Sequence, residues 1–239
     1  MGWRGALYRL LVPKSIEHQL QRKYQLSDEE IFVRYHRWYY NRRIWRSTTY
    51  LGIECQKWLG DLWNYQEILF NLKPSLVIEF GTHRGGSSLY FSDILQHVSP
   101  HSRVLTVDPD FGSIDAEVKE NEHIEVLTSS STEEIVAERI RQIRQEYSGP
   151  VFAILDSDHT KEHVLAEMKL LRPLLQSGDY LVVEDSNING HPVRPEWGEG
   201  PMEAIQAYEQ EYPDDYIHDV ERENRFGLTF APYGYLIRR

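Results

Sequence analysis

From residue 76 onward, short apolar runs alternate with longer amphipathic stretches. Five apolar runs, each bounded by turn-forming residues, lie at 76–80, 104–107, 124–127, 151–155 and 180–183. The stretches between them have the length and periodicity of helices, near 87–98, 114–122, 132–147 and 161–175. Uninterrupted apolar strands separated by helices are typical of a parallel sheet covered on both faces. The pattern therefore predicts an α/β domain with a Rossmann-like, doubly wound sheet.

The two ends of the chain depart from this alternation. The last apolar run, 228–237, follows a helix predicted near 201–211 and contains Pro232 and Gly234, which favour an edge or hairpin strand. Residues 1–72 have a helical, aromatic-rich pattern instead. We therefore divide the chain into an N-terminal helical extension or lid, 1–72, and a Rossmann-like domain, 73–239.

Within the N-terminal part, residues 31–50 form a basic and aromatic segment. It carries five arginines and no acidic residue, so the rest of the chain has a net charge of −16. Such a segment suits a membrane-facing or anionic-substrate surface. Alternatively, a helix packs its aromatic side chains against the body of the protein while its arginines face water. The sequence leaves both interpretations open.

Composition and charge limit the class of protein. Of the 239 residues, 41% are hydrophobic and 26% charged, as in an ordinary globular domain, and the net charge is −11. Because phosphate binding needs a basic surface, this charge argues against a nucleic-acid partner. Cys55 is the single cysteine, which excludes an intrachain disulfide and a CxxC metal site. The first apolar stretch is short and broken by arginine, so we expect neither a signal nor a transmembrane segment, and a cytoplasmic protein.

The first predicted strand runs directly into a glycine-rich turn, GTHRGGS at residues 81–87, which opens a helix. Glycines let the backbone turn sharply and approach a ligand, and ligands of open parallel sheets bind beyond the carboxyl ends of the strands. The turn has neither the GxGxxG dinucleotide fingerprint nor the GxxxxGK[ST] phosphate loop. Taken alone, it is also compatible with an ordinary strand-to-helix turn.

Two acidic residues indicate which ligand this turn binds. Glu79, inside the strand end, would repel a pyrophosphate but suits a cationic sulfonium amino acid. Asp108, which follows the second strand, is placed to accept hydrogen bonds from ribose hydroxyls. A cationic nucleoside without phosphate fits S-adenosylmethionine better than NAD. Ser129 and Ser130 would lie near the adenine, although serines there serve equally well as helix caps. The expected cofactor-binding residues are Glu79, Gly81, Thr82, Gly85, Gly86, Ser87, Asp108, Ser129, Ser130 and Asp156.

Acidic residues also follow the fourth and fifth strands. Asp156 and Asp158 follow the fourth, and Glu184 and Asp185 the fifth. Neighbouring strand ends lie close together, and two like charges about 4 Å apart repel by on the order of 4 kcal/mol at an effective dielectric of about 20. Such a cluster needs a proton, a basic partner or a metal. Because hard oxygen ligands favour Mg²⁺, Ca²⁺ or Mn²⁺, we expect Asp156, Glu184 and Asp185 to bind Mg²⁺ or another hard divalent cation.

A histidine lies next to this rim. His159 follows Asp156 by three residues, and an imidazole that titrates near neutral pH can remove the proton of an acceptor hydroxyl. His159 is therefore the candidate base, the alternative being a hydrogen-bonded rim residue. Asp158 is better explained as a cap of the helix starting near Thr160. In the long loop 186–201, His191 and Trp197 are candidates for substrate contact or parts of a lid.

Taken together, these motifs resemble the cephalosporin hydroxylase/rhamnosyl O-methyltransferase family of class I methyltransferases, over residues 50–237. The segments that carry the resemblance are KWLGDLWNYQE (57–67), EFGTHRGGS (79–87), LDSDH (155–159), VED (183–185) and GEGP (198–201). The resemblance implies a seven-stranded sheet with an antiparallel last strand and N-terminal helices that contribute to a substrate lid. It also implies Mg²⁺ on Asp156, Glu184 and Asp185 with His159 as base, and it leaves Asp158 as an alternative ligand to Asp156.

The sequence thus predicts an S-adenosylmethionine-dependent, Mg²⁺-assisted O-methyltransferase. Its acceptor would be a hydroxyl of a small molecule, a natural product or a sugar unit of one, and we expect a homo-oligomer. One alternative is a metal-independent N- or carboxyl methyltransferase, in which the carboxylates bind an amine. Another, of a different class, is a nucleoside-binding partner protein without transfer chemistry.

Overall fold

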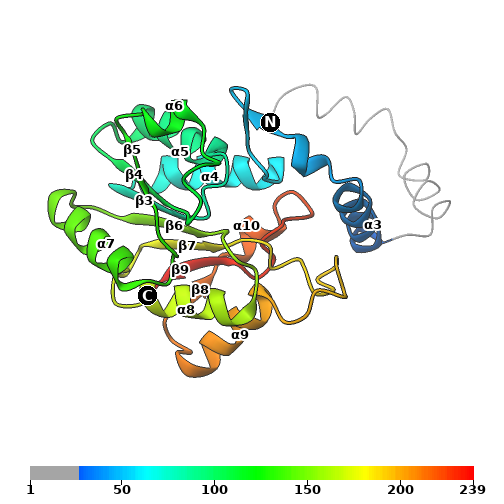
Figure 1. The fold of residues 1–239 in the computed structure, drawn as a ribbon. Coiled ribbons are helices and arrows are strands. Elements are labelled where there is room, and N and C mark those ends of the chain that lie inside the picture. Colours follow the sequence, from blue (N-terminus) through cyan, green and yellow to red (C-terminus); the bar gives the residue numbers. More distant parts are fainter. Residues whose placement is uncertain (1–26) are drawn as a thin grey trace, which may run out of the picture.

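The computed structural model describes residues 27–239 (Figure 1). In this range, seven strands form one sheet in the order β5-β4-β3-β6-β7-β9-β8. The bounds are β3 Leu76–Phe80, β4 Arg103–Val107, β5 Ile124–Leu127, β6 Val151–Leu155, β7 Tyr180–Val183, β8 Tyr216–His218 and β9 Tyr235–Arg238. Strands β3 to β7 run parallel, whereas β9 is antiparallel to both β7 and β8. The expected doubly wound, mostly parallel sheet is confirmed.

The strands outside the parallel part differ from the sequence pattern. Of the apolar run 228–237, only the part from Tyr235 onward is a strand, because backbone and side-chain donors of the preceding loop bind a buried carboxylate, Asp61, instead of a neighbouring strand. The three-residue β8 was not predicted. Nor was the hairpin of β1 (Thr49–Tyr50) and β2 (Ile53–Glu54), which lies in the segment interpreted as helical. Strands of two or three residues are too short to show a periodicity.

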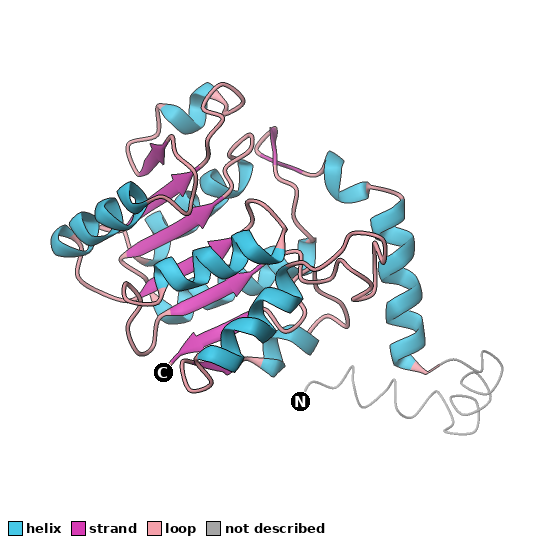
Figure 2. Ribbon diagram, turned by 60° about the horizontal axis from the view of Figure 1, so that its bottom comes forward, coloured by secondary structure: helices cyan, strands magenta, loops and turns pink. Residues whose placement is uncertain are grey.

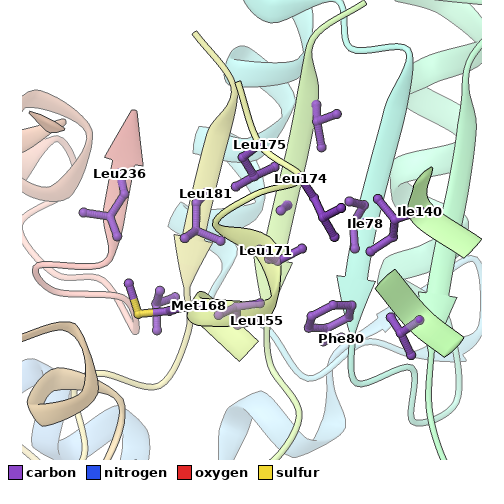
Figure 3. Packing of buried hydrophobic residues seen from close by; sticks show 14 of the residues in the cluster. Ile78, Phe80, Ile140, Leu155, Met168, Leu171, Leu174, Leu175, Leu181 and Leu236 are labelled. Atoms are coloured by element: carbon purple, nitrogen blue, oxygen red, sulfur yellow. The ribbon is translucent and has the colours of Figure 1, made fainter. Parts of the chain in front are cut away.

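Helices cover both faces of the sheet (Figures 1 and 2). One face packs against α4 (Leu59–Leu72), α5 (Gly86–Val98) and the short α6 (Ala116–Lys119). The other packs against α7 (Glu134–Glu146), α8 (Lys161–Leu171) and α9 (Pro201–Glu211). Figure 3 shows this second core, where Ile78 and Phe80 of β3 meet Ile140 and Leu171 of the helices. Because successive strand side chains alternate, Glu79 points to the α5 face.

The strand order reverses between β3 and β6, where ligands of doubly wound sheets bind. The Asp156 amide donates to the Phe80 carbonyl at 2.8 Å, so the two strands stay together up to their carboxyl ends. Gly81 follows at once with φ 96°, and a Cβ there would collide with the carbonyl oxygen of Asp156. Glycine is therefore required at this position for β3 and β6 to end side by side.

The elements before α4 lie near the carboxyl ends of the strands. They are α3 (Asp28–Asn41), the 3-10 helix η1 (Ile44–Ser47) and the hairpin. Figures 1 and 2 both show α3 beside the loop that follows β7, and Tyr39 and Tyr40 of α3 pack there against Ile188 and Val193. In contrast, α4 contributes Tyr65 and other apolar residues to the core of the sheet. Among the described helices, none is long and apolar enough to cross a membrane.

Asp61 of α4 fastens the C-terminal loop to the domain. Its buried carboxylate accepts hydrogen bonds from the Thr229 hydroxyl (2.6 Å), the Phe230 amide (2.8 Å) and the Tyr235 hydroxyl (2.7 Å). We expect Asp61→Ala to lower the free energy of unfolding by about 3 kcal/mol, because three buried donors lose their acceptor. Urea denaturation measures this. Glu138→Ala, an exposed charge on α7, is the control and should change stability by less than about 0.5 kcal/mol.

Candidate functional site

A cavity of about 1110 Å³ opens at the carboxyl ends of the strands. Its wall includes the glycine-rich turn, the residues that follow β4, β5, β6 and β7, and parts of η1 and the hairpin segment. The volume is at the upper end of the range for small-molecule sites, which leaves room for a nucleoside cofactor and an acceptor together.

Asp108 organises the glycine-rich turn. Its Oδ2 accepts hydrogen bonds from the backbone amides of Thr82 and His83, both at 3.0 Å, and its Oδ1 accepts one from the amide of Asp110 at 2.8 Å. Gly86 has a packing role, since a Cβ there would collide with the carbonyl of Glu54 in β2. The turn is thus held in shape by a carboxylate that also faces the cavity.

The structure brings six of the ten expected cofactor-binding residues into the cavity wall: Gly81, Thr82, Ser87, Asp108, Ser130 and Asp156. The other four, Glu79, Gly85, Gly86 and Ser129, are outside that wall. Glu79 is fully buried behind the turn, where Ser88 donates to it and Thr106 donates at 2.8 Å. Burial raises the pKa of Glu79, and its Oε1 has no hydrogen-bond partner. This free oxygen lies behind the turn expected to bind the cationic donor.

Three side chains converge where β6 and β7 end. Asp156 follows β6 directly, and Asp185 is the second residue after β7. Ligand atoms of Asp156, His159 and Asp185 lie within 4.8 Å of one another, and His159 Nε2 is 3.2 Å from Asp185 Oδ2. All three line the cavity. The structure thus assembles two expected metal ligands and the expected base at one rim.

Glu184, the third expected ligand, lies deeper and faces a lysine that the sequence reasoning missed. Lys57 is buried. Its Nζ donates a hydrogen bond to the carboxylate of Asp156 and lies 3.5 Å from Glu184 Oε1. The Tyr65 hydroxyl donates to the same oxygen at 2.5 Å. Burial raises the pKa of Glu184 to about 8, against the opposing charge of Lys57. Burial alone would lower the pKa of Lys57, but Asp156 and Glu184 together raise it.

A second buried carboxylate supports the wall beneath the serines that follow β5. Glu167 of α8 is fully buried and accepts hydrogen bonds from Ser131 and from Ser157, the latter at 2.5 Å, while His163 Nε2 is 3.3 Å away. The hydrogen bond to Glu167 raises the pKa of His163. The sequence feature that could have predicted a buried role for Glu167 is its place beside Met168, on the apolar side of the predicted helix. Asp158 Oδ1 accepts a hydrogen bond from the Thr160 amide at 2.8 Å in the turn before α8, but Thr160 is the N-cap residue and no side chain caps this helix, so the expected cap role of Asp158 is wrong.

Aromatic and basic residues surround the mouth of the cavity. Tyr40, Arg43 and Arg46 contribute from the N-terminal segment, and Arg194 and Trp197 from the loop after β7. The Trp197 indole donates to the backbone carbonyl of His159 at 3.2 Å. His191, the other candidate of this loop, instead pairs with Glu203 at 2.9 Å and is outside the cavity wall.

Comparison with known proteins agrees with this geometry. A model of the Rhamnosyl O-methyltransferase/CmcI family matches residues 42–239. The rhamnosyl O-methyltransferase of Mycobacterium tuberculosis H37Rv is 57% identical over 215 residues, which cover 90% of this chain and 87% of that protein. The protein of the same name from Mycobacterium leprae is 54% identical over 211 residues, covering 88% and 92%.

Solved structures share the fold at low sequence identity. A CmcI structure with Mg and SAM has a TM-score of 0.66 at 21% identity, covering 81% of this chain and 77% of that one. CalS11, a TDP-rhamnose 3'-O-methyltransferase, has a TM-score of 0.52 at 17% identity, covering 74% and 78%. The sequence matches carry the assignment, and they confirm the resemblance found in the motifs. The chain belongs to the rhamnosyl O-methyltransferase/CmcI family.

Proposed function

We propose that this enzyme transfers the methyl group of S-adenosylmethionine to a hydroxyl of a rhamnosyl unit, with the assistance of Mg²⁺. The observation that carries the proposal is that Asp156, His159 and Asp185 share one cavity with the glycine-rich turn. A methyl donor on the turn and an acceptor hydroxyl at the rim would then meet in one oriented site. The names of the curated relatives support rhamnose as the acceptor sugar.

The donor is assigned to the side of the cavity formed by β3, β4 and β5. The turn after β3 would hold the methionine part, Asp108 would accept hydrogen bonds from the ribose, and Ser130 would lie on the adenine side, since all three line the cavity. The unpartnered Oε1 of Glu79 behind the turn carries partial negative charge, which favours a sulfonium over a neutral thioether. This difference helps the product, S-adenosylhomocysteine, to leave after the transfer.

The rim fits a hard divalent cation. Asp156 and Asp185 offer carboxylate oxygens close together, and two such ligands leave positions for water and a substrate oxygen, as Mg²⁺ prefers. When bound there, Mg²⁺ would supply positive charge that acidifies the acceptor hydroxyl. Glu184 stays the expected third ligand of this proposal, although its Oε1 faces Lys57 and Tyr65 in the structure.

His159 removes the acceptor proton in this mechanism. S-adenosylmethionine, when bound on the turn, would supply the methyl group to the hydroxyl oxygen and keep the electrons of the broken bond on its sulfur, and the imidazole of His159 would take the hydroxyl proton. Asp185, 3.2 Å from Nε2, then stabilises the imidazolium. Trp197, which is hydrogen-bonded to the His159 carbonyl, helps to keep water from the rim.

The described part of the N-terminal extension serves as a lid in this proposal, since Tyr40, Arg43 and Arg46 stand at the mouth. Cytoplasmic location and homo-oligomeric assembly, expected from the sequence, stay predictions.

A second candidate function is metal-independent methyl transfer. It is favoured by Lys57, whose ammonium group already neutralises Asp156 and lies beside Glu184 without any metal. In that case Lys57 alone supplies the positive charge at the rim.

Metal removal separates the two candidates. We expect the purified enzyme to methylate a soluble rhamnoside, and exhaustive chelation to lower turnover by about tenfold or more because the acceptor hydroxyl is no longer acidified. The measurement is transfer of labelled methyl to rhamnosides and to matched glucosides, before chelation, after it, and after Mg²⁺ is restored. Full activity in the chelated enzyme would establish the metal-independent candidate, and a lack of transfer to any rhamnoside would refute the proposed acceptor.

The base role of His159 predicts a selective loss of turnover. We expect His159→Ala to lower kcat by about 100-fold, since general bases contribute roughly that factor, while the affinity for S-adenosylhomocysteine stays unchanged. Rapid-quench kinetics and calorimetry measure the two quantities. His97→Ala, an exposed histidine at the far end of α5, is the control. If kcat of the His159 variant equals that of the control, His159 does not act as the base.

The turn predicts a role for the charge of Asp108. We expect Asp108→Asn to weaken S-adenosylhomocysteine binding by about tenfold, because the amides of Thr82 and His83 lose a charged acceptor and the turn loosens. Isothermal titration calorimetry measures the affinity. The control is Asp214→Asn, an exposed carboxylate between α9 and β8 and away from the turn, which should bind normally. Normal affinity in the Asp108 variant would show that the turn holds its shape without this carboxylate.

A further inference from the structure

Helix α3 has two apolar faces, and one of them is exposed. His36, Tyr39 and Tyr40 are buried against the body of the protein. On an adjoining side, Ile31, Tyr35 and Trp38 recur at the i, i+4, i+7 spacing and are 45%, 43% and 50% exposed, although one edge of the Tyr35 ring contacts Tyr39 and Trp58. Packing of aromatics onto the body therefore explains Tyr39 and Tyr40, but it leaves about half of each side chain of this second stripe exposed.

Positive charge accompanies the exposed stripe. Arg34, Arg37 and Arg42 of this segment are exposed, and Arg43 and Arg46 follow. Within residues 27–239, none of these five arginines has a carboxylate oxygen within 4.0 Å; Arg37 donates to the carbonyl of Pro192. Elsewhere in the described chain, exposed arginines such as Arg141 and Arg225 pair with glutamates.

The charge of the whole chain is divided in the same way. Residues 1–50 contain ten Lys or Arg and four Asp or Glu, whereas residues 51–239 contain 16 and 33. Such a strong asymmetry indicates that the basic end meets an anionic partner. The three acids of α3 all lie in its first turn, so the later turns carry the positive charge.

We infer that the exposed face of α3 docks the enzyme onto an anionic lipid surface. Tryptophan and tyrosine favour the boundary between headgroups and acyl chains, and arginines extend their aliphatic stems along it while binding lipid phosphates. Ile31, Tyr35 and Trp38 would enter the boundary, and Arg34 and Arg42 would contact headgroups. The helix would lie along the surface.

This docking places the cavity mouth near the lipid. Tyr40 and Arg43 line the cavity and follow Trp38 by two and five residues. Leu51, in the turn of the hairpin that follows, is 69% exposed. An acceptor attached to a lipid would thus reach the rim without leaving the surface. That consequence rests on the proposed methyl transfer, whereas the docking itself does not.

Two other partners for the exposed face of α3, residues 1–26 of the same chain and a second copy of the protein, are less compatible with its positive charge. Residues 1–26 contain five Lys or Arg and one Glu, so covering α3 with them would bring like charges together. A two-fold contact with a second copy would place the same arginines of both copies opposite one another. An anionic lipid surface instead attracts both basic segments.

The test is co-sedimentation of the full-length protein with vesicles of phosphatidylcholine alone or mixed with phosphatidylglycerol, at low and high salt. We expect binding to the mixed vesicles that weakens with salt, and little binding to neutral ones. Trp38→Ser and the double variant Arg34→Gln/Arg42→Gln should each weaken binding by about tenfold. The matched controls are Trp63→Ser, an exposed tryptophan of α4, and Arg141→Gln on α7, which should bind like the parent.

Several outcomes would overturn the inference. These are no sedimentation with mixed vesicles at low salt, or equal binding of the α3 variants and their controls. If deletion of residues 1–26 abolished vesicle binding and Trp38→Ser had no effect, the lipid contact would be assigned to residues 1–26. Light scattering that shows a dimer lost in Trp38→Ser would assign the face to a second copy. We expect the α3 variants to methylate a soluble rhamnoside as fast as the parent protein does. If the parent protein itself transferred no methyl group to any rhamnoside, the proposed function would be refuted, but the vesicle-binding result would still stand.

Discussion

The carboxylates at the ends of β6 and β7 lie together because Lys57 is buried beside them. Without a cation, carboxylates about 4 Å apart repel by on the order of 4 kcal/mol each pair at an effective dielectric of about 20. The ammonium group of Lys57 bonds Asp156 and lies 3.5 Å from Glu184, and Tyr65 donates a further hydrogen bond to Glu184. The active rim, and with it the end of both strands, depends on this one buried charge.

Lys57 also couples the N-terminal segment to the sheet. It lies between the hairpin and α4, and α4 in turn is held by Asp61 to the loop before β9. The same stretch of chain therefore supplies the neutralising cation, part of the cavity wall and the contact that fixes the C-terminal strand. A change in the position of α4 would move the ammonium group away from the rim, so fold and electrostatics are linked here.

The parallel strands could be predicted from sequence because each is a short, largely apolar run followed by a glycine or a polar residue. The same rule placed Asp108, Asp156 and Asp185 at the cavity, since carboxyl ends of parallel strands meet at one edge. It could not find Lys57 or Glu167, because a lone charged residue before a helix or on one looks solvated until its partners are known. Nor could it separate Glu184 from Asp185, because both follow the last strand residue, Val183, and the left-handed backbone of Asp185 that turns it toward the cavity is not visible in the sequence.

Charge explains why these features occur in one molecule. The rim gathers carboxylates, and residues 51–239 as a whole carry 33 acidic against 16 basic residues. An acidic enzyme is repelled by an anionic lipid surface unless one region carries net positive charge, and here residues 31–50, which include Arg43 and Arg46 of the cavity wall, are such a region. Repulsion of the acidic body then favours the orientation in which α3 faces the lipid. If α3 docks as inferred, the same distribution of charge turns the cavity mouth toward the lipid surface.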